Sequence, residues 1–141
     1  MGVQTFLLEL GVNECERRLA TASLGRLGVI VDGRPEIFPV NHAFDPVTRR
    51  VLFPTRAGTK LHAALHWPWV AFEVDGEEPD GSAGWSVLVV GKAEEVTDNA
   101  EIARASQLRK VLWGTGTGVH WIGVDSSQTT GRQISAPSTS F

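Results

Sequence analysis

The sequence predicts a mainly β fold, a small antiparallel barrel with short helices at its ends. Several short β-forming runs are separated by Asp-Gly and Asp-Pro turns, which is typical of strands joined by hairpins. Apolar residues recur at helical spacing only over brief segments. The alternation of strands with long helices that a doubly wound nucleotide-binding fold requires is absent from the sequence.

Composition limits the size and class of the protein. With 141 residues, 42% of them hydrophobic, we expect a single domain over residues 1–141, with a core at 12–135 and a tail at 136–141. A net charge of -3 gives no sign of a nucleic-acid-binding surface. The single Cys15 fits a reducing compartment, and no run of residues resembles a signal peptide or is long enough to span a membrane. These features predict a cytoplasmic protein.

The first expected elements are a helix and a hairpin. Asn13 and Glu16 match a capping box, so a helix is expected from there to about Gly25. Asp32-Gly33 then separates two β-forming runs and predicts a tight hairpin. Proline cannot donate a backbone hydrogen bond, so Pro39 in the second run marks a sheet edge, a bulge or a backbone that meets a ligand. An ordinary edge strand and a ligand edge both remain open.

The next strand leads into a loop with the composition of an anion site. Residues 51–53 are apolar, Thr55 and Arg56 follow, and Thr59-Lys60 opens a segment with helical spacing. Two hydroxyls, two basic side chains and the free amides of a helix start would suit a phosphate. The alternative is that Thr59 only caps the helix and that the basic side chains are solvated.

The remaining elements follow in order. Trp67-Pro68 should end the short helix. The apolar run after Trp85 predicts a central strand covered on both faces, and Asp98 with Glu101 predicts a capped helix to about Val111. The other expected strands are residues 70–74, 121–124 and 130–134, with an acidic loop at 75–84 and a flexible loop at 113–118.

Local patterns that suggest metal binding or nucleophilic catalysis are weak. Residues 114–118 alternate glycine and threonine but follow a helix instead of a strand, which favours a mobile connection over a phosphate loop. His62 and His66 lie one helical turn apart without an evident third ligand, which favours solvated histidines over zinc. The surroundings of the serines and of Cys15 are not those of a nucleophile. We therefore expect neither a metal site nor hydrolytic catalysis.

A series of segments in a fixed order has a more specific pattern. The segments are Pro39-Val40-Asn41-His42, Phe53-Pro54-Thr55, Gly58-Thr59-Lys60-Leu61, residues 70–75, Gly84-Trp85-Ser86-Val87, Trp121-Ile122 and Thr130-Gly131-Arg132. The series resembles the pyridoxamine 5'-phosphate oxidase-like FMN-binding split-barrel family, especially its small nitroimidazole-resistance-like members, over about residues 12–135. The resemblance implies a Greek-key split barrel, bound FMN or alternatively a deazaflavin, and a homodimer with the cofactor site at its interface.

The resemblance also implies which residues contact the cofactor. The expected cofactor-binding residues are Phe38, Pro39, Val40, Asn41, His42, Thr55, Arg56, Thr59, Lys60, Ser86 and Arg132. The first five would lie along the isoalloxazine ring, Thr59 and Lys60 would bind the phosphate, and Ser86 and Arg132 would approach the ring from later strands. His42 is the candidate proton donor, with a packed or solvated histidine as the alternative.

The activity implied by the resemblance is an FMN-dependent oxidoreductase that transfers hydride or electrons to a small molecule. The alternatives are a deazaflavin-dependent reductase, a flavin or haem carrier or sensor, and a barrel that has lost its cofactor. Only Arg132 stands where oxidases of vitamin B6 phosphates carry a basic, histidine-containing signature, so pyridoxamine phosphate oxidation is not expected. The four tryptophans Trp67, Trp69, Trp85 and Trp121 exceed what one small core needs, which agrees with a dimer.

Overall fold

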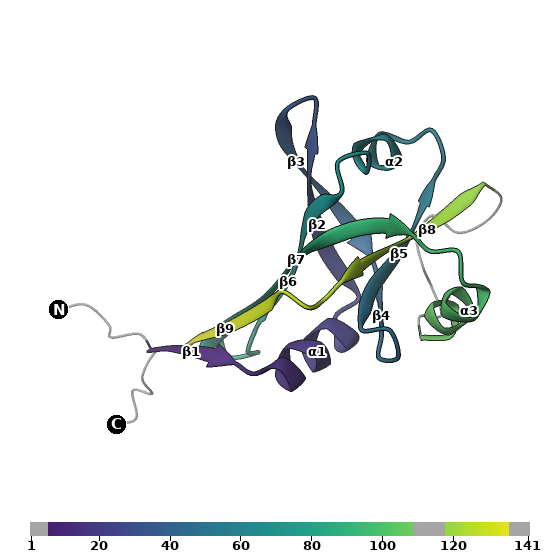
Figure 1. The fold of residues 1–141 in the computed structure, drawn as a ribbon. Coiled ribbons are helices and arrows are strands. Elements are labelled where there is room, and N and C mark those ends of the chain that lie inside the picture. Colours follow the sequence, from purple (N-terminus) through teal and green to yellow (C-terminus); the bar gives the residue numbers. More distant parts are fainter. Residues whose placement is uncertain (1–5, 109–117, 136–141) are drawn as a thin grey trace, which may run out of the picture.

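The protein is a curled antiparallel sheet with short helices around it (Figure 1). The computed structural model describes residues 6–108 and 118–135, and for Lys60 the backbone only. Along these residues the chain forms β1 (Phe6–Leu10), α1 (Val12–Thr21), β2 (Leu24–Val31), β3 (Arg34–Asn41), β4 (Ala43–Asp45), β5 (Arg50–Arg56), α2 (Lys60–Ala64), β6 (Trp69–Glu77), β7 (Ala83–Glu95), α3 (Asn99–Leu108), β8 (Val119–Asp125) and β9 (Thr129–Ser135).

Strand β7 is the element that curls the sheet. The strand order is β3-β2-β6-β7-β8-β5-β4, and all the ladders are antiparallel. On one edge β7 pairs with β6; on the other, its first residues pair with β9 and its last three with β8. The two ends of β7 therefore belong to two differently directed sheet halves, which enclose the core between them. The prediction of a small antiparallel barrel is confirmed.

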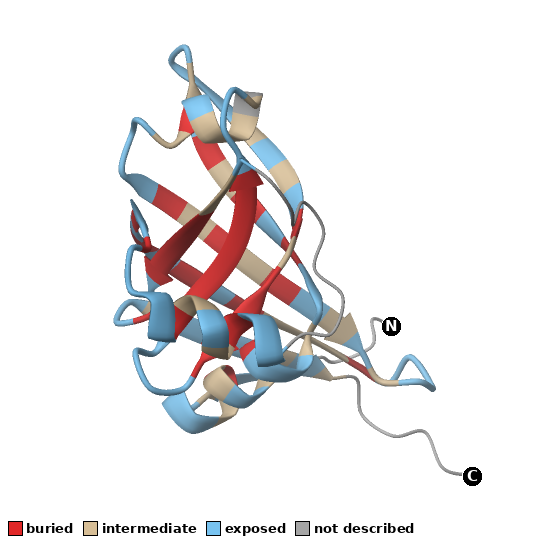
Figure 2. Cartoon of the chain, turned by 90° about the vertical axis from the view of Figure 1, so that its right-hand side faces the viewer, coloured by how far each residue is buried: buried red, intermediate tan, exposed pale blue. Residues whose placement is uncertain are grey.

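The core lies inside this curl. Leu27, Phe53 and Phe72 are fully buried, and α1 covers one open end with Cys15 and Leu19. Figure 2 shows the buried residues along the strands in the middle of the molecule and the exposed ones along helices and turns. A second, smaller cluster beneath α3 contains Ala43, Leu52, Val96, Ala105 and Trp121. Trp121 is thus a core residue, and the expectation that it adds exposed aromatic surface is wrong.

The predicted capping box at the first helix is wrong. The helix begins at Val12 with Gly11 as its N-cap, and no side chain caps it. The neighbouring carboxylate of Glu14 does not cap the helix either; it pairs with two arginines one turn further along. The helix also ends earlier than expected, at Thr21. Gly25 lies in β2, where a Cβ would be 2.2 Å from the Phe72 ring, so this glycine serves the packing of the core and does not end a helix.

The predicted hairpin and edge strand are confirmed. Asp32 and Gly33 have φ values of 52° and 76°, the left-handed conformation that a two-residue type I′ turn requires. In the described part of the chain β3 pairs only with β2, so Pro39 lies on an edge strand. An edge strand is where a residue without an N–H is tolerated.

Strands β6 and β7 differ from the prediction in length and in burial. Strand β6 continues to Glu77 and β7 runs from Ala83, so the acidic loop is shorter than expected. Along β7 buried and exposed residues alternate, and Leu88 and Val90 are 39% and 37% exposed. The expectation of a strand covered on both faces is therefore wrong for the single chain.

Three further expectations concern helix ends and loops. Helix α2 ends at Ala64, before Trp67-Pro68. Asp98 caps α3 by accepting from the Ala100 N–H at 2.9 Å, but Glu101 is buried and does not complete a capping box. The predicted helix end at Val111, the Gly-Thr loop up to residue 117 and the tail at 136–141 lie outside the described residues. In the part of the chain that the structure describes, none of the helices has the length and apolar character needed to cross a bilayer.

Candidate functional site

Two threonine hydroxyls meet where β5 ends and α2 begins. Thr55 is 4% exposed, and its Oγ1 lies 3.3 Å from Oγ1 of Thr59. Thr59 is the N-cap of α2: its Oγ1 accepts from the His62 N–H at 3.1 Å and lies 2.7 Å from the Arg56 carbonyl oxygen, to which it can donate. We call residues 55–60 the threonine corner. The predicted helix cap at Thr59 is confirmed, and the buried hydroxyl of Thr55 lies beside it.

The backbone of the threonine corner is held by its neighbours. Gly58 has a φ of +80°, and the Ala57 N–H donates at 3.3 Å to the carbonyl of Gly118, the residue before β8. Arg56 is exposed, and Lys60 is the first residue of α2. Because α2 has only five residues, its dipole is small. Anion binding at this corner would therefore depend on the hydroxyls and the two basic side chains.

The predicted residues on β3 face two directions. Val40 is 5% exposed and Phe38 packs against the core, so both side chains point into the barrel. Pro39 and Asn41 alternate with them on the outer side, where the Asn41 amide donates to the Ser23 carbonyl at 2.6 Å. A ligand at the open edge of β3 would meet the backbone carbonyl and ring of Pro39, because the backbone groups of Phe38 and Val40 point to β2.

His42 is a core residue. Its side chain is fully buried, its Nε2 lies 2.9 Å from the Leu19 carbonyl oxygen, and its ring packs edge-on against Phe72 with centroids 4.8 Å apart. A proton donor to a bound substrate has to come within hydrogen-bond reach of it. The burial of His42 favours the packed histidine that the sequence left as the alternative.

Ser86 and Arg132 lie side by side on the outer face of the sheet. They are register partners on β7 and β9, and they line a hollow of about 450 Å³ with Glu73, Asp75 and Glu77 of β6. We call it the acidic hollow. Arg26 crosses from β2 to Glu73 at 3.1 Å and to Asp75 at 2.6 Å. Burial of Glu73, together with its neighbour Asp75, raises the pKa of the Glu73 carboxyl.

Trp85 forms part of the wall of the acidic hollow. Its ring lies against Gly76, where a Cβ would be 2.9 Å away, and the Arg18 guanidinium stands 4.6 Å from the ring centroid. A side chain at position 76 would push the indole away, so the glycine fixes its position. Sequence reasoning missed this wall and the carboxylates, although Ala71, Glu73 and Asp75 alternate along β6 and therefore share a face.

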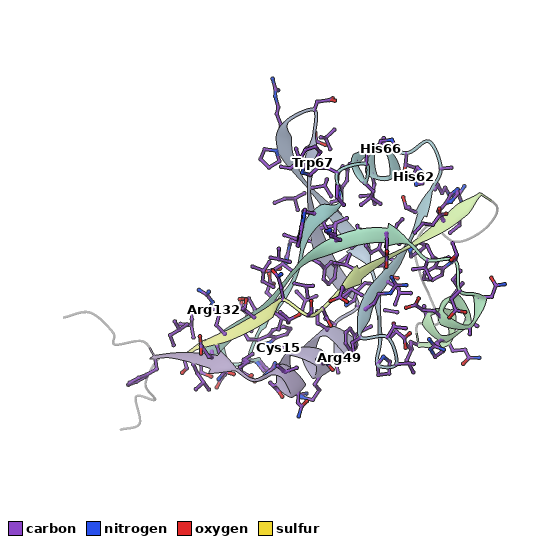
Figure 3. All side chains as sticks on the ribbon, in the orientation of Figure 1. Cys15, Arg49, His62, His66, Trp67 and Arg132 are labelled. Atoms are coloured by element: carbon purple, nitrogen blue, oxygen red, sulfur yellow. The ribbon has the colours of Figure 1, made fainter. Side chains whose placement is uncertain are left out.

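The structure does not bring the predicted site residues into one pocket. Figure 3 shows Arg132 at one end of the molecule, and His62 and His66, which follow the threonine corner on and after α2, at the other. The residues that line the acidic hollow include Ser86 and Arg132 but none from the corner. The predicted residues thus form separate groups on one protomer: the corner, the edge strand and the acidic hollow.

Residues 12–133 match the sequence profile of the family described as pyridoxamine 5'-phosphate oxidase. The chain belongs to this family. An uncharacterised Mycobacterium tuberculosis protein, Rv0080, is 36% identical over 107 residues, which cover 72% of this chain and 69% of the relative. The FAD binding protein from Mycobacterium smegmatis is 37% identical with a TM-score of 0.75, covering 89% of this chain and 98% of that one. A FAD-binding protein from Mesorhizobium loti, 24% identical with a TM-score of 0.79, shares the fold over 94% of this chain and 99% of its own.

This member of the pyridoxamine 5'-phosphate oxidase family also has an exposed apolar surface that the sequence did not reveal. Strands β3, β2, β6 and β7 present it side by side, around a hollow of about 450 Å³. We call it the apolar outer face; its exposed large side chains are Ile30, Ile37, Trp69, Leu88 and Val90. Contiguous exposed apolar surface is common at protein–protein contacts and ligand-binding grooves.

A further group of polar residues lies beside α2. The rings of His62 and His120 are 5.0 Å apart, and His120 Nδ1 contacts Glu95. His62, Glu95 and the exposed His66 line a hollow of about 160 Å³. Among the described residues, no three histidine, cysteine or carboxylate side chains are grouped so that they could hold a metal ion.

Proposed function

We propose that this chain is a cytoplasmic, homodimeric FMN-binding oxidoreductase that transfers hydride or electrons to a small molecule. The observation that carries the proposal is the threonine corner. There a nearly buried hydroxyl and an N-cap hydroxyl lie 3.3 Å apart, and a basic residue follows each of the two threonines in the sequence. The single buried Cys15 supports the reducing compartment.

The donor set of the corner fits a phosphate monoester. Phosphate oxygens accept several hydrogen bonds and are bound best by charged donors. Thr55 offers a hydroxyl, the Thr59 hydroxyl would turn from the Arg56 carbonyl towards the phosphate, and Arg56 and Lys60 bring positive charge on either side of Gly58 in the sequence. The M. smegmatis relative, which is a FAD binding protein, supports a flavin as the bearer of that phosphate.

The separation of the predicted residues supports a second protomer. The corner and the acidic hollow share no lining residue, and Figure 3 shows Arg132 at one end of the molecule and His62, which follows the corner on α2, at the other. We propose a twofold dimer packed on the apolar outer face, in which the acidic hollow of one copy faces the corner of the other. The same contact would cover Ile37, Leu88 and Val90, which the single chain leaves in water.

In such a site the flavin would supply the redox chemistry, and the protein would bind and orient it. The corner would hold the phosphate, the outer edge of β3 would lie along the ring, and Ser86 with Arg132 would donate hydrogen bonds from the second protomer. Burial in the dimer would exclude water from the ring. A single arginine near the C-terminal strand is a poor match for a vitamin B6 phosphate, so we propose a different small-molecule substrate.

Lys60→Ala tests the corner directly. Removing one charge-assisted contact of about 1.5–3 kcal/mol should weaken FMN binding by about ten- to a hundredfold. Riboflavin has the same ring but no phosphate, so its affinity should change little. Titrating wild type and variant with both flavins, followed by flavin fluorescence, measures the two losses.

Arg17→Ala is the matched control, because it also removes one positive charge but from the exposed side of α1. It should leave both affinities as they are. Equal losses of FMN and riboflavin in Lys60→Ala would indicate general damage, and no loss of FMN would show that Thr59-Lys60 is a helix cap without a ligand.

A further inference from the structure

The threonine corner has a histidine neighbour that sequence reasoning did not identify. His120 in β8 is the register partner of Thr55 in β5, and such partners carry their side chains on the same face, with Cβ atoms about 4.5–5.5 Å apart. The ring of His120 also lies 5.0 Å from the ring of His62, whose backbone N–H donates to Thr59. His120 therefore adjoins Thr55 directly and Thr59 through His62.

Glu95 determines which nitrogen of His120 is available. The Nδ1 atom contacts the Glu95 carboxylate, and an ionised carboxylate can only accept, so Nδ1 carries a hydrogen. The other nitrogen, Nε2, has a lone pair in the neutral ring and a second hydrogen in the charged ring. The His120 side chain is 36% exposed, so the ring is accessible to a ligand.

Of the two neighbouring histidines, His120 is the better place for an added proton. His62 Nδ1 is buried and has no hydrogen-bond partner among the described residues. A proton there would make a buried donor without an acceptor, which costs free energy. On His120 the positive charge would instead lie against the carboxylate of Glu95.

The other charged residues around the pair decide when that proton is favourable. Glu94 binds Arg50 at 2.6 Å, and His66 is exposed one helical turn after His62. Arg56 and Lys60 in the corner have the same sign of charge as a protonated His120. Without an anion at the corner they oppose the proton that Glu95 favours.

A phosphate at the corner would reverse this opposition. A phosphate monoester carries a charge of about −1.5 to −2 near pH 7 and accepts several hydrogen bonds. With a neutral His120, the Glu95 carboxylate would stand behind an uncharged ring and repel it. A protonated His120 offers it both a positive charge and an Nε2–H donor. Binding of the phosphate and uptake of a proton therefore favour each other.

We propose that His120 binds the cofactor phosphate through its Nε2–H, that Glu95 positions the ring, and that a proton enters the site together with the phosphate. The inference rests on the proposed phosphate site at the corner. It adds to Arg56 and Lys60 a third positive charge, which forms mainly when the phosphate is bound. Riboflavin, which has no phosphate, should bind without taking up this proton.

Calorimetric titration of the full chain measures the proton directly. At about pH 7.5 a free imidazole is mostly neutral and a phosphate monoester is mostly doubly charged. Titrations in phosphate-free buffers of different ionisation enthalpy give the number of protons taken up per flavin bound. We expect wild type to take up a large fraction of one proton with FMN and none with riboflavin. Equal uptake with the two flavins would overturn the inference.

His120→Gln keeps a hydrogen-bond donor but cannot take up the proton. At about pH 7.5 it should lose the uptake and about tenfold in FMN affinity, with riboflavin affinity unchanged. Between about pH 6.5 and 8.5 the FMN affinity of wild type should fall, because an imidazolium loses its proton as the pH rises, and that of the variant should stay level. Equal losses for FMN and riboflavin in the variant would contradict a phosphate contact.

Glu95→Gln should also reduce the uptake, because the ring loses the carboxylate that favours its charge. Glu94→Gln is the matched control, since it removes the neighbouring carboxylate, which binds Arg50 instead. The two proposals fail separately. A chain that binds FMN no better than riboflavin contradicts the phosphate site and the proposed function with it. A chain that prefers FMN but takes up equal numbers of protons in wild type and His120→Gln contradicts only the role of His120.

Discussion

Replacing Glu101 by alanine should lower the free energy of unfolding by about 3–5 kcal/mol, the loss typical of a buried ion pair that is left with one partner. The Glu101 side chain is 2% exposed. Its carboxylate accepts from Arg50 Nε at 3.0 Å and Nη2 at 2.5 Å, and from the Thr48 hydroxyl at 2.5 Å. These contacts fasten α3 to the strands of the second core cluster. Urea unfolding followed by tryptophan fluorescence measures the loss.

Glu94→Ala is the matched control, because Glu94 binds the same arginine. Its carboxylate lies 2.6 Å from Arg50 Nη1, but the side chain is 70% exposed. An ion pair in water contributes about 0–1 kcal/mol, so this variant should remain close to wild type. Similar losses for Glu94→Ala and Glu101→Ala would show that burial does not decide the contribution of Glu101.

The same network sets how stability depends on pH. Hydrogen bonds from Arg50 hold the pKa of Glu101 below its ordinary value of 4.5, against the effect of burial. Burial would raise the pKa of Asp45, but Arg104, the Val47 N–H and Thr48 outweigh it and lower that pKa below 3.8. Both carboxyls are more acidic in the folded chain, so their stabilisation is present above these values and disappears as the pH falls through the folded pKa values. In Glu101→Gln, the free energy of unfolding should fall less on acidification than it does in wild type.

Val90→Asp should convert the proposed dimer into a monomer. Val90 is an exposed residue of the apolar outer face, and an aspartate there would be buried without a partner if two copies pack on this face. We expect the dimer to weaken by at least about a hundredfold and flavin affinity to fall with it, because each site would lose the residues of the second protomer. Sedimentation equilibrium and flavin titration measure the two effects.

Val12→Asp provides the control for Val90→Asp. Val12 is 56% exposed at the start of α1, where a negative charge is compatible with the helix. This variant should dimerise and bind flavin like wild type. A wild-type chain that keeps the 15.3 kDa monomer mass at high concentration with FMN present would exclude the dimer altogether.

The parts of the fold that the sequence predicted depend on local signals. The Asp32-Gly33 hairpin, the Thr59 cap and the edge position of Pro39 each follow from the conformational limits of one or two residues. Glu101 shows where local reasoning fails. Its position three residues after Asp98 matches a capping box, but its partner Arg50 is 51 residues away, and only the folded chain brings the two together.

The candidate site was predictable only in pieces for the same reason. The residues of the threonine corner are contiguous in sequence, so its hydroxyls and basic residues could be identified together. The acidic hollow depends on the register of β6, β7 and β9, which hydrophobic patterns do not specify between strands that are distant in the chain.

Strand β3 has two prolines, Pro35 and Pro39, and they are four residues apart on the same outer side. Proline in a strand is tolerated where its missing N–H would face away from the neighbouring strand. The open edge of β3 therefore lacks two backbone hydrogen-bond donors. An incoming strand from another molecule would find too few donors there to form a continuous ladder, which protects the exposed edge against fibril-like stacking of chains. A flat ring needs only one or two backbone groups, so the same edge that resists aggregation stays accessible to a small planar molecule.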